Sequence, residues 1–345
     1  PDTFRNKVVY CNCDDPFESN FFRYFVLNFN KLGLIKLITT SYKPSPVANT
    51  QLQLFGDDKT LTKSKGRPKV TANKFIINQV HDIDDDGEFN LKDIAMQLKA
   101  NKQNEWMPLK DDGDFRSNEC IALLKQADIV VTNPPFSLFR EYVKQLFDLK
   151  KQFLIIGNMN AITYKESFPK IQENEMRIWP SISSGDGEFQ VPESYPITAA
   201  GWRVDEERRK FLRIKGVRWF TNLDHGRRHQ SLPLMTMADN FKYSKHKEIR
   251  GKGYEKYDNY DAIEVPFTDA IPSDYAGVMG VPISFLDKYC PEQFEIVGAT
   301  ESEGKGFSEG LWDKTSKISQ PIVNNERIYK RIFIKHRNST KWRQH

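Results

Sequence analysis

The sequence predicts an α/β protein in which a doubly wound, mostly parallel sheet is followed by a smaller, irregular domain. Two observations predict this fold. Short β-branched and apolar runs alternate with helical patterns through the first two thirds of the 345 residues, which is the order of a sheet covered by helices on both faces. From about residue 231 the chain is rich in Pro, Gly, Tyr and Asp, and this periodicity is lost. We therefore expect one domain over residues 1–230 and a second over residues 231–345.

The elements of the first domain follow from apolar periodicity and from capping and breaking residues. The expected strands are residues 7–11, 34–40, 128–132, 153–157, 176–179 and 217–223. The expected helices are residues 20–29 after an N-cap at Ser19, 91–99, 119–126, 139–149 and 165–173. Stretches near 42–110 and 181–215 interrupt the alternation and are expected as insertions. In the second domain, residues 328–334 form a short extended run.

Composition limits the class of protein. The four cysteines are too few and too scattered for a disulfide framework or a zinc site, which is typical of a reducing, cytoplasmic compartment. No apolar run approaches the ~20 residues of a membrane span, so we expect a soluble protein with no membrane contact. Net charge is +5, but residues 201–252 hold 14 Lys and Arg against 6 Asp and Glu, interleaved with aromatic residues. This pattern favours phosphate neutralisation and base stacking, and a solvated charged face is the alternative.

One buried strand ends in two successive prolines. Residues 129–131 have the composition of a buried strand, which Pro134 and Pro135 must end. In parallel sheets, ligands bind outside the carboxyl ends of strands. There the prolines hold the Asn133 side-chain carbonyl and the Pro134 main-chain carbonyl as two rigid acceptors, and Phe136 adds a π face. Such a pair suits an exocyclic NH2 group, because accepting both hydrogens turns the lone pair of the nitrogen towards an electrophile. A simple proline-terminated turn is the alternative.

Asn-Pro-Pro-Phe at a strand end resembles the catalytic motif of S-adenosylmethionine-dependent amino methyltransferases. The surrounding sequence resembles, more closely, the EcoRI-type adenine-N6 DNA methyltransferases. The stretches that carry this resemblance run in the same order from residue 7 to about 297: "KVVYCNCDDP", "GDFRS", "DIVVTNPPFSLFR", "FLIIGNMNAITYKE", "TNLDH", "KYDNYDAI", "GVMGVPISFL" and "PEQFEI". The resemblance implies a Rossmann-like methyltransferase sheet in the first domain, target recognition in the second, and S-adenosylmethionine as cofactor.

Residue roles carried over by position follow from this resemblance. The implied catalytic residues are Asn133, Pro134, Pro135 and Phe136, of which the first two accept the N6 hydrogens and the last stacks on a flipped adenine. The implied cofactor-binding residues are Cys11, Asn12, Cys13, Asp14, Asp15, Asp114 and Phe115. Carboxylates suit the cationic sulfonium and ammonium of the cofactor, although turn residues before a helix are the alternative for Asp14 and Asp15.

The sequence departs from the usual methyltransferase pattern in three places. No Gly-x-Gly follows the first strand, and the second strand ends in Thr39-Thr40-Ser41 without the acid that commonly holds ribose hydroxyls. The chain also begins at Pro1, close to the first strand, where such enzymes usually have an upstream segment that closes over the cofactor. Either the chain is a piece of a longer protein or cofactor affinity is reduced.

Three further patterns are less specific. Residues 82–93 match the spacing of a calcium loop, but Asp93 replaces the bidentate Glu and a strand-like run precedes them, which favours an acidic hairpin. His225 and His229 lack the Glu of a zinc-peptidase helix, so we expect no metal site there. With Arg227 and Arg228 between them, they are instead candidates for nucleic-acid binding. The basic stretch 63–69, "KSKGRPK", suits a minor groove or a flexible linker equally.

The resemblance implies a site-specific adenine DNA methyltransferase that extrudes its target base, as the modification enzyme of a restriction-modification system. Its partners would be double-stranded DNA and, through the family, a cognate restriction endonuclease. Two alternatives stay open, an RNA adenine-N6 methyltransferase and a catalytically silent DNA-binding protein on the same scaffold. We expect a cytoplasmic monomer, since no long apolar interface stripe is visible. The recognised DNA sequence does not follow from these residues.

Overall fold

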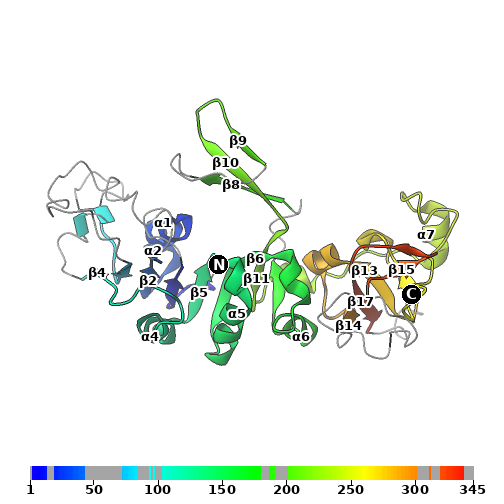
Figure 1. Ribbon diagram of the computed structural model, residues 1–345, viewed down its shortest axis with the longest axis horizontal. Coiled ribbons are helices and arrows are strands. Elements are labelled where there is room, and N and C mark those ends of the chain that lie inside the picture. The colour runs from blue at the N-terminus through cyan, green and yellow to red at the C-terminus, as the bar shows by residue number, and fades with distance from the viewer. Residues whose placement is uncertain are drawn as a thin grey trace. The chain divides into compact units, whose positions relative to one another are not determined.

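The structure, a computed structural model, describes residues 2–13, 19–42, 72–83, 93–94, 96–97, 103–179, 186–191, 201–300, 311 and 319–337. The chain divides into two compact units, each made of two stretches of sequence (Figure 1). The first unit comprises residues 1–158 and 184–221, and the second comprises residues 159–183 and 222–345. No helix among these described residues is long and apolar enough to cross a bilayer.

The first unit is built on a mixed β-sheet. In spatial order its strands are β4 (Glu105–Pro108), β3 (Asn73–Ile77), β2 (Lys36–Thr40), β1 (Val8–Cys11), β5 (Ile129–Thr132), β6 (Gln152–Asn158) and β11 (Val217–Thr221). The centre is parallel, because β1 pairs with β2 and β5, and β5 pairs with β6. On one side β3 is antiparallel to β2 and β4 is antiparallel to β3, and on the other side β11 is antiparallel to β6.

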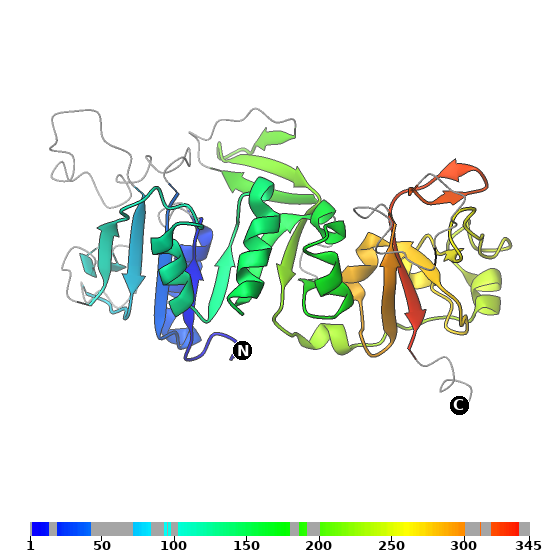
Figure 2. The same ribbon diagram turned by 60° about the horizontal axis from the view of Figure 1, so that its bottom comes forward.

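The helices with fully described bounds that accompany this sheet are α1 (Asn20–Leu27), α2 (Phe29–Leu32), α4 (Asn118–Gln126) and α5 (Phe139–Asp148). Figures 1 and 2 show α4 and α5 on one face of the sheet and α1 on the other. Ser19 caps α1 as predicted, since its hydroxyl accepts from the N–H of Phe21 at 3.1 Å. The helices on two faces of a parallel centre confirm the predicted doubly wound α/β fold.

The antiparallel edges of the sheet were not predicted. Strands β3 and β4 fall within residues 42–110, which we expected as an insertion, and together they extend the sheet by a strand pair. The expected helix over 91–99 lies largely outside the described residues. Within it, only 93–94 and 96–97 are described, and these are helical. The strand-like run before the acidic residues at 82–93 is β3, in agreement with the sequence.

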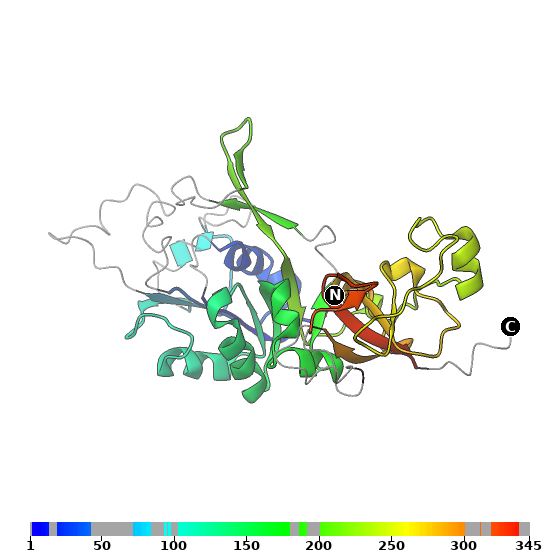
Figure 3. The same cartoon turned by 45° about the vertical axis from the view of Figure 1, so that its right-hand side comes forward.

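The expected insertion at 181–215 contains a small antiparallel sheet. Its strands are β8 (Asp186–Val191), β10 (Lys210–Lys215) and β9 (Trp202–Val204), in that spatial order. Figure 3 shows β9 and β10 as a long hairpin. Across this sheet, the guanidinium of Arg203 donates two hydrogen bonds, of 2.8 and 2.7 Å, to the carboxylate of Glu188. Gly216, at φ 69°, then turns the chain directly from β10 into β11.

The second unit has its own sheet and core. Its sheet contains β12 (Ile263–Glu264), β13 (Met279–Pro282), β17 (Arg331–His336) and β14 (Phe294–Ala299), in that spatial order. Its other elements are η3 (Met159–Thr163), α6 (Phe168–Gln172), β7 (Arg177–Trp179), η4 (Gly226–His229), α7 (Met237–Tyr243), η5 (Thr268–Ala270), η6 (Ile283–Lys288), β15 (Ile322–Val323) and β16 (Glu326–Arg327). The rings of Phe285 and Phe294 are fully buried and 5.3 Å apart. The region that we expected to be irregular therefore contains an ordered sheet.

Candidate active site at the strand ends

The predicted acceptor pair lies directly after β5, at the carboxyl edge of the parallel strands. Every residue of β5 is buried, whereas Asn133, the next residue, is exposed. Pro135, at φ −58° and ψ 123°, then leads into a short 3-10 helix that begins at Phe136. The Phe136 ring is 36% exposed, so one face is accessible to another ring. The two prolines thus end the strand and present an amide and an aromatic face side by side in the sequence.

The end of β1 meets the end of β5 through Asn12. Asn12 follows β1 and is 1% exposed. Its main-chain carbonyl accepts a hydrogen bond from the hydroxyl of Thr132, the residue immediately before Asn133. Its side-chain oxygen accepts from the hydroxyl of Tyr142, which lies on α5. Asn12 therefore joins the loop predicted to hold the cofactor to the segment predicted to hold the target amine.

The tight turn after β1 uses a cysteine where glycine would be easiest. Cys13 has φ 63°, in the left-handed region that L-residues rarely adopt. The missing Gly-x-Gly pattern therefore does not remove the turn, because Cys13 adopts the left-handed conformation itself. The predicted residues Asp14 and Asp15 lie outside the described residues, whereas Cys11 is fully buried at the end of the strand.

Asp114 and Phe115 lie just before α4. Arg116 binds the Asp114 carboxylate through its Nε at 2.9 Å and its Nη2 at 2.7 Å. These hydrogen bonds lower the pKa of Asp114, although its partial burial acts in the opposite direction. Phe115 is 3% exposed and packs edge-on against Tyr142, with centroids 5.0 Å apart. Phe115 thus supports the tyrosine that binds Asn12, while Asp114 is held as an ionised carboxylate.

The close approach between Gly113 and the end of β2 has no signal in the local sequence. Gly113 has φ 81°, and a Cβ there would overlap the carbonyl oxygen of Ser41. Only glycine fits this backbone approach. It brings the loop that carries Asp114 against the carboxyl end of β2, next to the end of β1.

Two buried polar atoms at these strand ends have no hydrogen-bond partner within the described structure. They are Nδ2 of Asn12 and Oγ1 of Thr39, on residues that are 1% and 0% exposed. Thr39 pairs with Cys11 in the β1–β2 register, so the two atoms come from adjacent strand ends. Buried polar groups are nearly always hydrogen-bonded, so orphans of this kind mark a place for a polar ligand. An amide N–H and a hydroxyl suit the carboxylate and hydroxyl groups of S-adenosylmethionine, and we had not predicted a role for Thr39.

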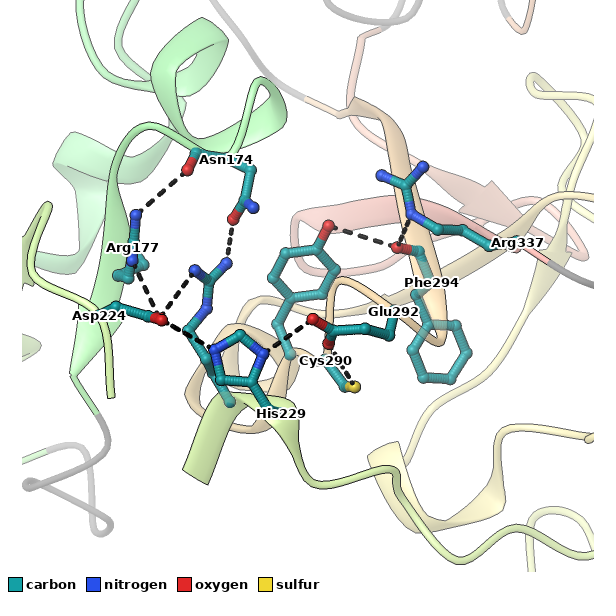
Figure 4. Close-up of polar contacts among 10 residues, drawn as sticks. Asn174, Arg177, Asp224, His229, Cys290, Glu292, Phe294 and Arg337 are labelled. Carbon is teal, nitrogen blue, oxygen red and sulfur yellow. Dashed lines mark hydrogen bonds and ion pairs between the residues drawn. The ribbon is translucent and has the colours of Figure 1, made fainter. Parts of the chain in front are cut away.

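The four residues predicted to bind nucleic acid lie in the second unit, on or beside η4, and they have different surroundings. Figure 4 shows His229 among its polar partners. The Arg228 side chain is 6% exposed and bonds to Asn174 and to Asp224, the latter at 3.3 Å. His225 is half-buried, with its ring 4.6 Å from that of Trp179, and burial followed by the charge of Arg228 lowers its pKa. Contacts within the protein therefore engage the Arg228 guanidinium and cover much of the His225 ring, which leaves little of either side chain for DNA.

His229 is 42% exposed and bridges two acids. Its Nε2 lies 2.9 Å from Asp224, and its Nδ1 lies 2.8 Å from Glu292. These contacts raise the pKa of His229. Partial burial would raise the pKa of Asp224, but hydrogen bonds from His229 and Arg228 outweigh it and lower that pKa to about 2. In contrast, Arg227 is exposed and forms no ion pair with a described residue.

Residues 82–93 are the stretch whose spacing resembles a calcium loop. Among the described residues, no three His, Cys, Asp or Glu side chains gather as metal ligands. Asp93, fully buried, accepts a 2.9 Å hydrogen bond from the N–H of Ile83 and so closes a local turn. The acidic residues between Ile83 and Asp93 lie outside the described residues, and so does the basic stretch 63–69.

A doubly wound sheet with a ligand site at the carboxyl ends of its central strands is the architecture of an α/β methyltransferase. The family model described as "Adenine-specific methyltransferase EcoRI" matches residues 1–337, and the chain belongs to this family. It is therefore an adenine-specific methyltransferase, and S-adenosylmethionine is the general methyl donor of such enzymes.

Three curated relatives share nearly the whole chain. It is 40% identical over 338 residues to the type II methyltransferase M.EcoRI of Escherichia coli, covering 98% of this chain and 88% of that protein. It is 31% identical to M.MpnI of Mycoplasma pneumoniae, with 98% and 90% covered. It is 33% identical to M.MgeORF184P of Mycoplasma genitalium, with 96% and 89% covered. No solved structure matches the chain.

Proposed function

We propose that the protein transfers a methyl group from S-adenosylmethionine to N6 of an adenine in double-stranded DNA, as the modification enzyme of a restriction-modification system. The observation that carries this proposal is the joining of two strand ends by Asn12. The residue that follows β1 binds Thr132 directly before the Asn133 motif, so the two halves of a transfer site lie side by side. The type II designation of the three relatives supports DNA as the substrate.

In this proposal, Asn133 and Pro134 hold the target amine. The side-chain oxygen of Asn133 and the carbonyl of Pro134 each accept one N6 hydrogen, which directs the nitrogen lone pair out of the plane of the base. Phe136 stacks on the adenine ring and fixes its plane, and Pro135 keeps the two carbonyls rigid. Methylation places a positive charge on N6, and the two oxygens stabilise it until one N6 proton leaves to solvent.

Residues at the ends of β1 and β2 would hold the cofactor, whose sulfonium supplies an electrophilic methyl group. Asn12, through its orphaned Nδ2, and Thr39, through its orphaned Oγ1, would each make one hydrogen bond to it. The left-handed turn at Cys13 and the close approach of Gly113 would position the two loops beside it, with Cys11 buried beneath them. Asp114, kept ionised by Arg116, would face the cofactor from the third side, and Asp14 and Asp15 would add charge. Phe115 would act through Tyr142.

The adenine must leave the duplex to reach this site, because its N6 group is paired inside the helix. The second unit would recognise the target sequence, and its exposed cations, Arg227 among them, would contact the DNA backbone. The same proposal places the enzyme in the cytoplasm, as a monomer, with a cognate endonuclease acting on the same sequence. Each of these statements depends on DNA being the substrate.

One experiment tests the substrate, the atom and the cofactor together. The purified protein is incubated with S-adenosylmethionine labelled in its methyl group and with plasmid DNA or structured RNA, and the products are digested to nucleosides. We expect label in N6-methyladenine from plasmid DNA, at one short motif in long-read maps. Label from RNA alone would replace DNA as the substrate. Cofactor binding with no transfer to either would contradict the proposed activity.

A further inference from the structure

The second unit contains a cleft of about 540 Å³ beside η4, η5 and η6, lined by polar side chains and by the apolar Leu232 and Pro233. Two cations, an amide and three hydroxyls line it: Arg227, Lys288, Gln230, Ser231, Thr268 and Ser284. This volume is that of a small-ligand site, yet most of the side chains around it are hydrogen-bond donors rather than apolar groups. A concave surface rich in donors and cations suits an anion with several acceptor oxygens.

We propose that this cleft binds one phosphodiester of the DNA backbone and so fixes the position of the duplex on the second unit. The inference rests on the proposed function, since it names the phosphate site of that same substrate. Arg227 and Lys288 would neutralise the phosphate, and the hydroxyls of Thr268 and Ser284 would donate to its oxygens. Contacts of this kind position a protein on DNA without reading its sequence.

The charge of the cleft favours a diester over a terminal phosphate. Its lining also includes one carboxylate, Asp287, opposite in sign to the two cations. Together these three side chains carry one net positive charge, which matches the single charge of a backbone phosphodiester. A phosphomonoester or free phosphate carries ~1.5 to 2 negative charges near neutral pH and would meet the carboxylate as well. The cleft therefore fits an internal phosphate of a strand.

The polar network of Figure 4 anchors η4, the element that carries Arg227. Arg228 and His229, the next two residues of η4, bind Asp224, and His229 also binds Glu292. Arg227 takes no part in these ion pairs and lines the cleft. A cation on an anchored turn loses less conformational entropy on binding than one on a free loop.

Two other walls of the cleft are also fixed. The side chain of Gln293 fixes the backbone of the segment that follows η4. It accepts a hydrogen bond from the N–H of Leu232 at 2.7 Å and donates one to the carbonyl of Leu232 at 3.0 Å. On η6, Phe285 and Leu286 are buried, while Ser284 and Lys288 are exposed. The donors of the cleft are therefore placed by buried or clamped neighbours, as expected of a preformed site.

The test is the salt dependence of duplex binding by the full-length protein with both cleft cations neutralised, Arg227→Gln with Lys288→Gln. The slope of log K against log salt is about 0.9 for each phosphate that the protein neutralises, so loss of the single phosphate of the cleft lowers it by about 0.9. Affinity at 0.1 M salt falls roughly tenfold by the same relation, for target and non-target duplexes alike. Lys247→Gln, an exposed lysine of the same unit that does not line the cleft, is the matched control and keeps the wild-type slope.

A set of duplexes that each carry one uncharged methylphosphonate identifies the phosphate. One position should weaken binding by the wild-type protein and leave binding by the double variant unchanged. A wild-type slope in the double variant overturns the cleft proposal, and so does binding of inorganic phosphate in the cleft with an unchanged slope. Methyl transfer by the wild-type protein to duplex DNA is measured in parallel. If the wild-type protein transfers no methyl group to DNA, the proposed function is refuted. If it transfers methyl groups but the double variant keeps the wild-type slope, only the cleft proposal is refuted.

Discussion

The hydroxyl of Tyr142 donates a hydrogen bond to the side-chain oxygen of Asn12, a residue 130 positions earlier in the chain. Both side chains are buried, and the opposite end of the Asn12 amide is the orphaned Nδ2. The tyrosine therefore sets which way the amide faces, with its oxygen towards α5 and its nitrogen towards the proposed cofactor. A residue of α5 thus orients the Asn12 side chain, which follows β1 in the candidate site.

Tyr142→Phe should weaken cofactor binding more than it weakens the fold. The change removes one donor and leaves a buried acceptor unpaired, which costs about 1–3 kcal/mol in unfolding free energy. Because the amide can then rotate, we expect about tenfold weaker cofactor binding, measured by calorimetry, since a lost hydrogen bond of ~1.4 kcal/mol is a factor of ten. Tyr24→Phe, at an exposed tyrosine of the same unit, is the control. Equal cofactor affinity in the Tyr142 variant and the wild type would remove Asn12 from the cofactor site.

Asn133→Ala should abolish most turnover and keep cofactor binding. It removes one of the two acceptors of the target amine, and losing one such preorganised group typically costs about 100- to 1,000-fold in kcat. Single-turnover methylation with excess enzyme measures the chemical step, and calorimetry measures cofactor affinity. Ser137→Ala, at the exposed neighbouring residue, should behave as the wild type. Turnover within a few-fold of the wild type in the Asn133 variant would contradict the acceptor role.

Gly113→Ala should destabilise the first unit severely. A left-handed φ costs a non-glycine residue about 1–2 kcal/mol, and here the new Cβ also overlaps the Ser41 carbonyl oxygen. Two other glycines separate these effects. Gly251 has φ 76° with open space around it, so its alanine variant should lose about 1 kcal/mol, and Gly226, without either constraint, should lose almost nothing. Urea unfolding of the three variants should rank them in this order, and a Gly113 variant as stable as the Gly251 variant would refute the overlap.

The stability of the second unit should pass through a maximum near pH 6.5. The pKa of His229 is raised in the folded protein, so its contribution is complete below 6.5 and is lost as pH rises through the folded value. The pKa of His225 is lowered, so its contribution is complete above 6.5 and is lost as pH falls through the folded value. Asp224, with its pKa lowered to about 2, loses its contribution at still lower pH, from about 4 downwards.

Thermal melts across pH 5–9 measure this profile. His229→Gln should remove the decline above pH 6.5 and keep the decline below it, because His225 is unchanged. The burial of His225, together with the nearby charges of Arg228 and Arg177, should keep that acidic decline in both proteins. A variant whose alkaline decline equals that of the wild type would show that His229 is not the group responsible.

Local sequence was enough to predict the centre of the sheet and the position of the Asn-Pro-Pro-Phe segment at a strand end. The apolar run of β5, the double proline after it and the cap at Ser19 each depend on neighbours in the chain, and the structure has all three as predicted. The strand-like run of β3 was recognised but not placed in the sheet, and β4 was missed, because their pairing partners lie far away across an interrupted stretch of sequence.

Residues that act through distant contacts could not be predicted in the same way. The role of Tyr142 depends on Asn12, and the requirement for Gly113 depends on Ser41, so neither has a local signature. The two arginines at 227 and 228 are identical in sequence terms, yet one is exposed and the other is buried against Asn174 and Asp224. Only the tertiary surroundings distinguish them.

The chain passes from one compact unit to the other three times, after residues 158, 183 and 221. Neither unit is thus a single continuous segment, and no single cut in the gene separates them. An exchange of the C-terminal part alone would leave residues 159–183 behind and split the core of the second unit. A recombinant enzyme with a new second unit would need both of its segments from the same donor, which restricts how a new sequence specificity could be acquired by gene shuffling.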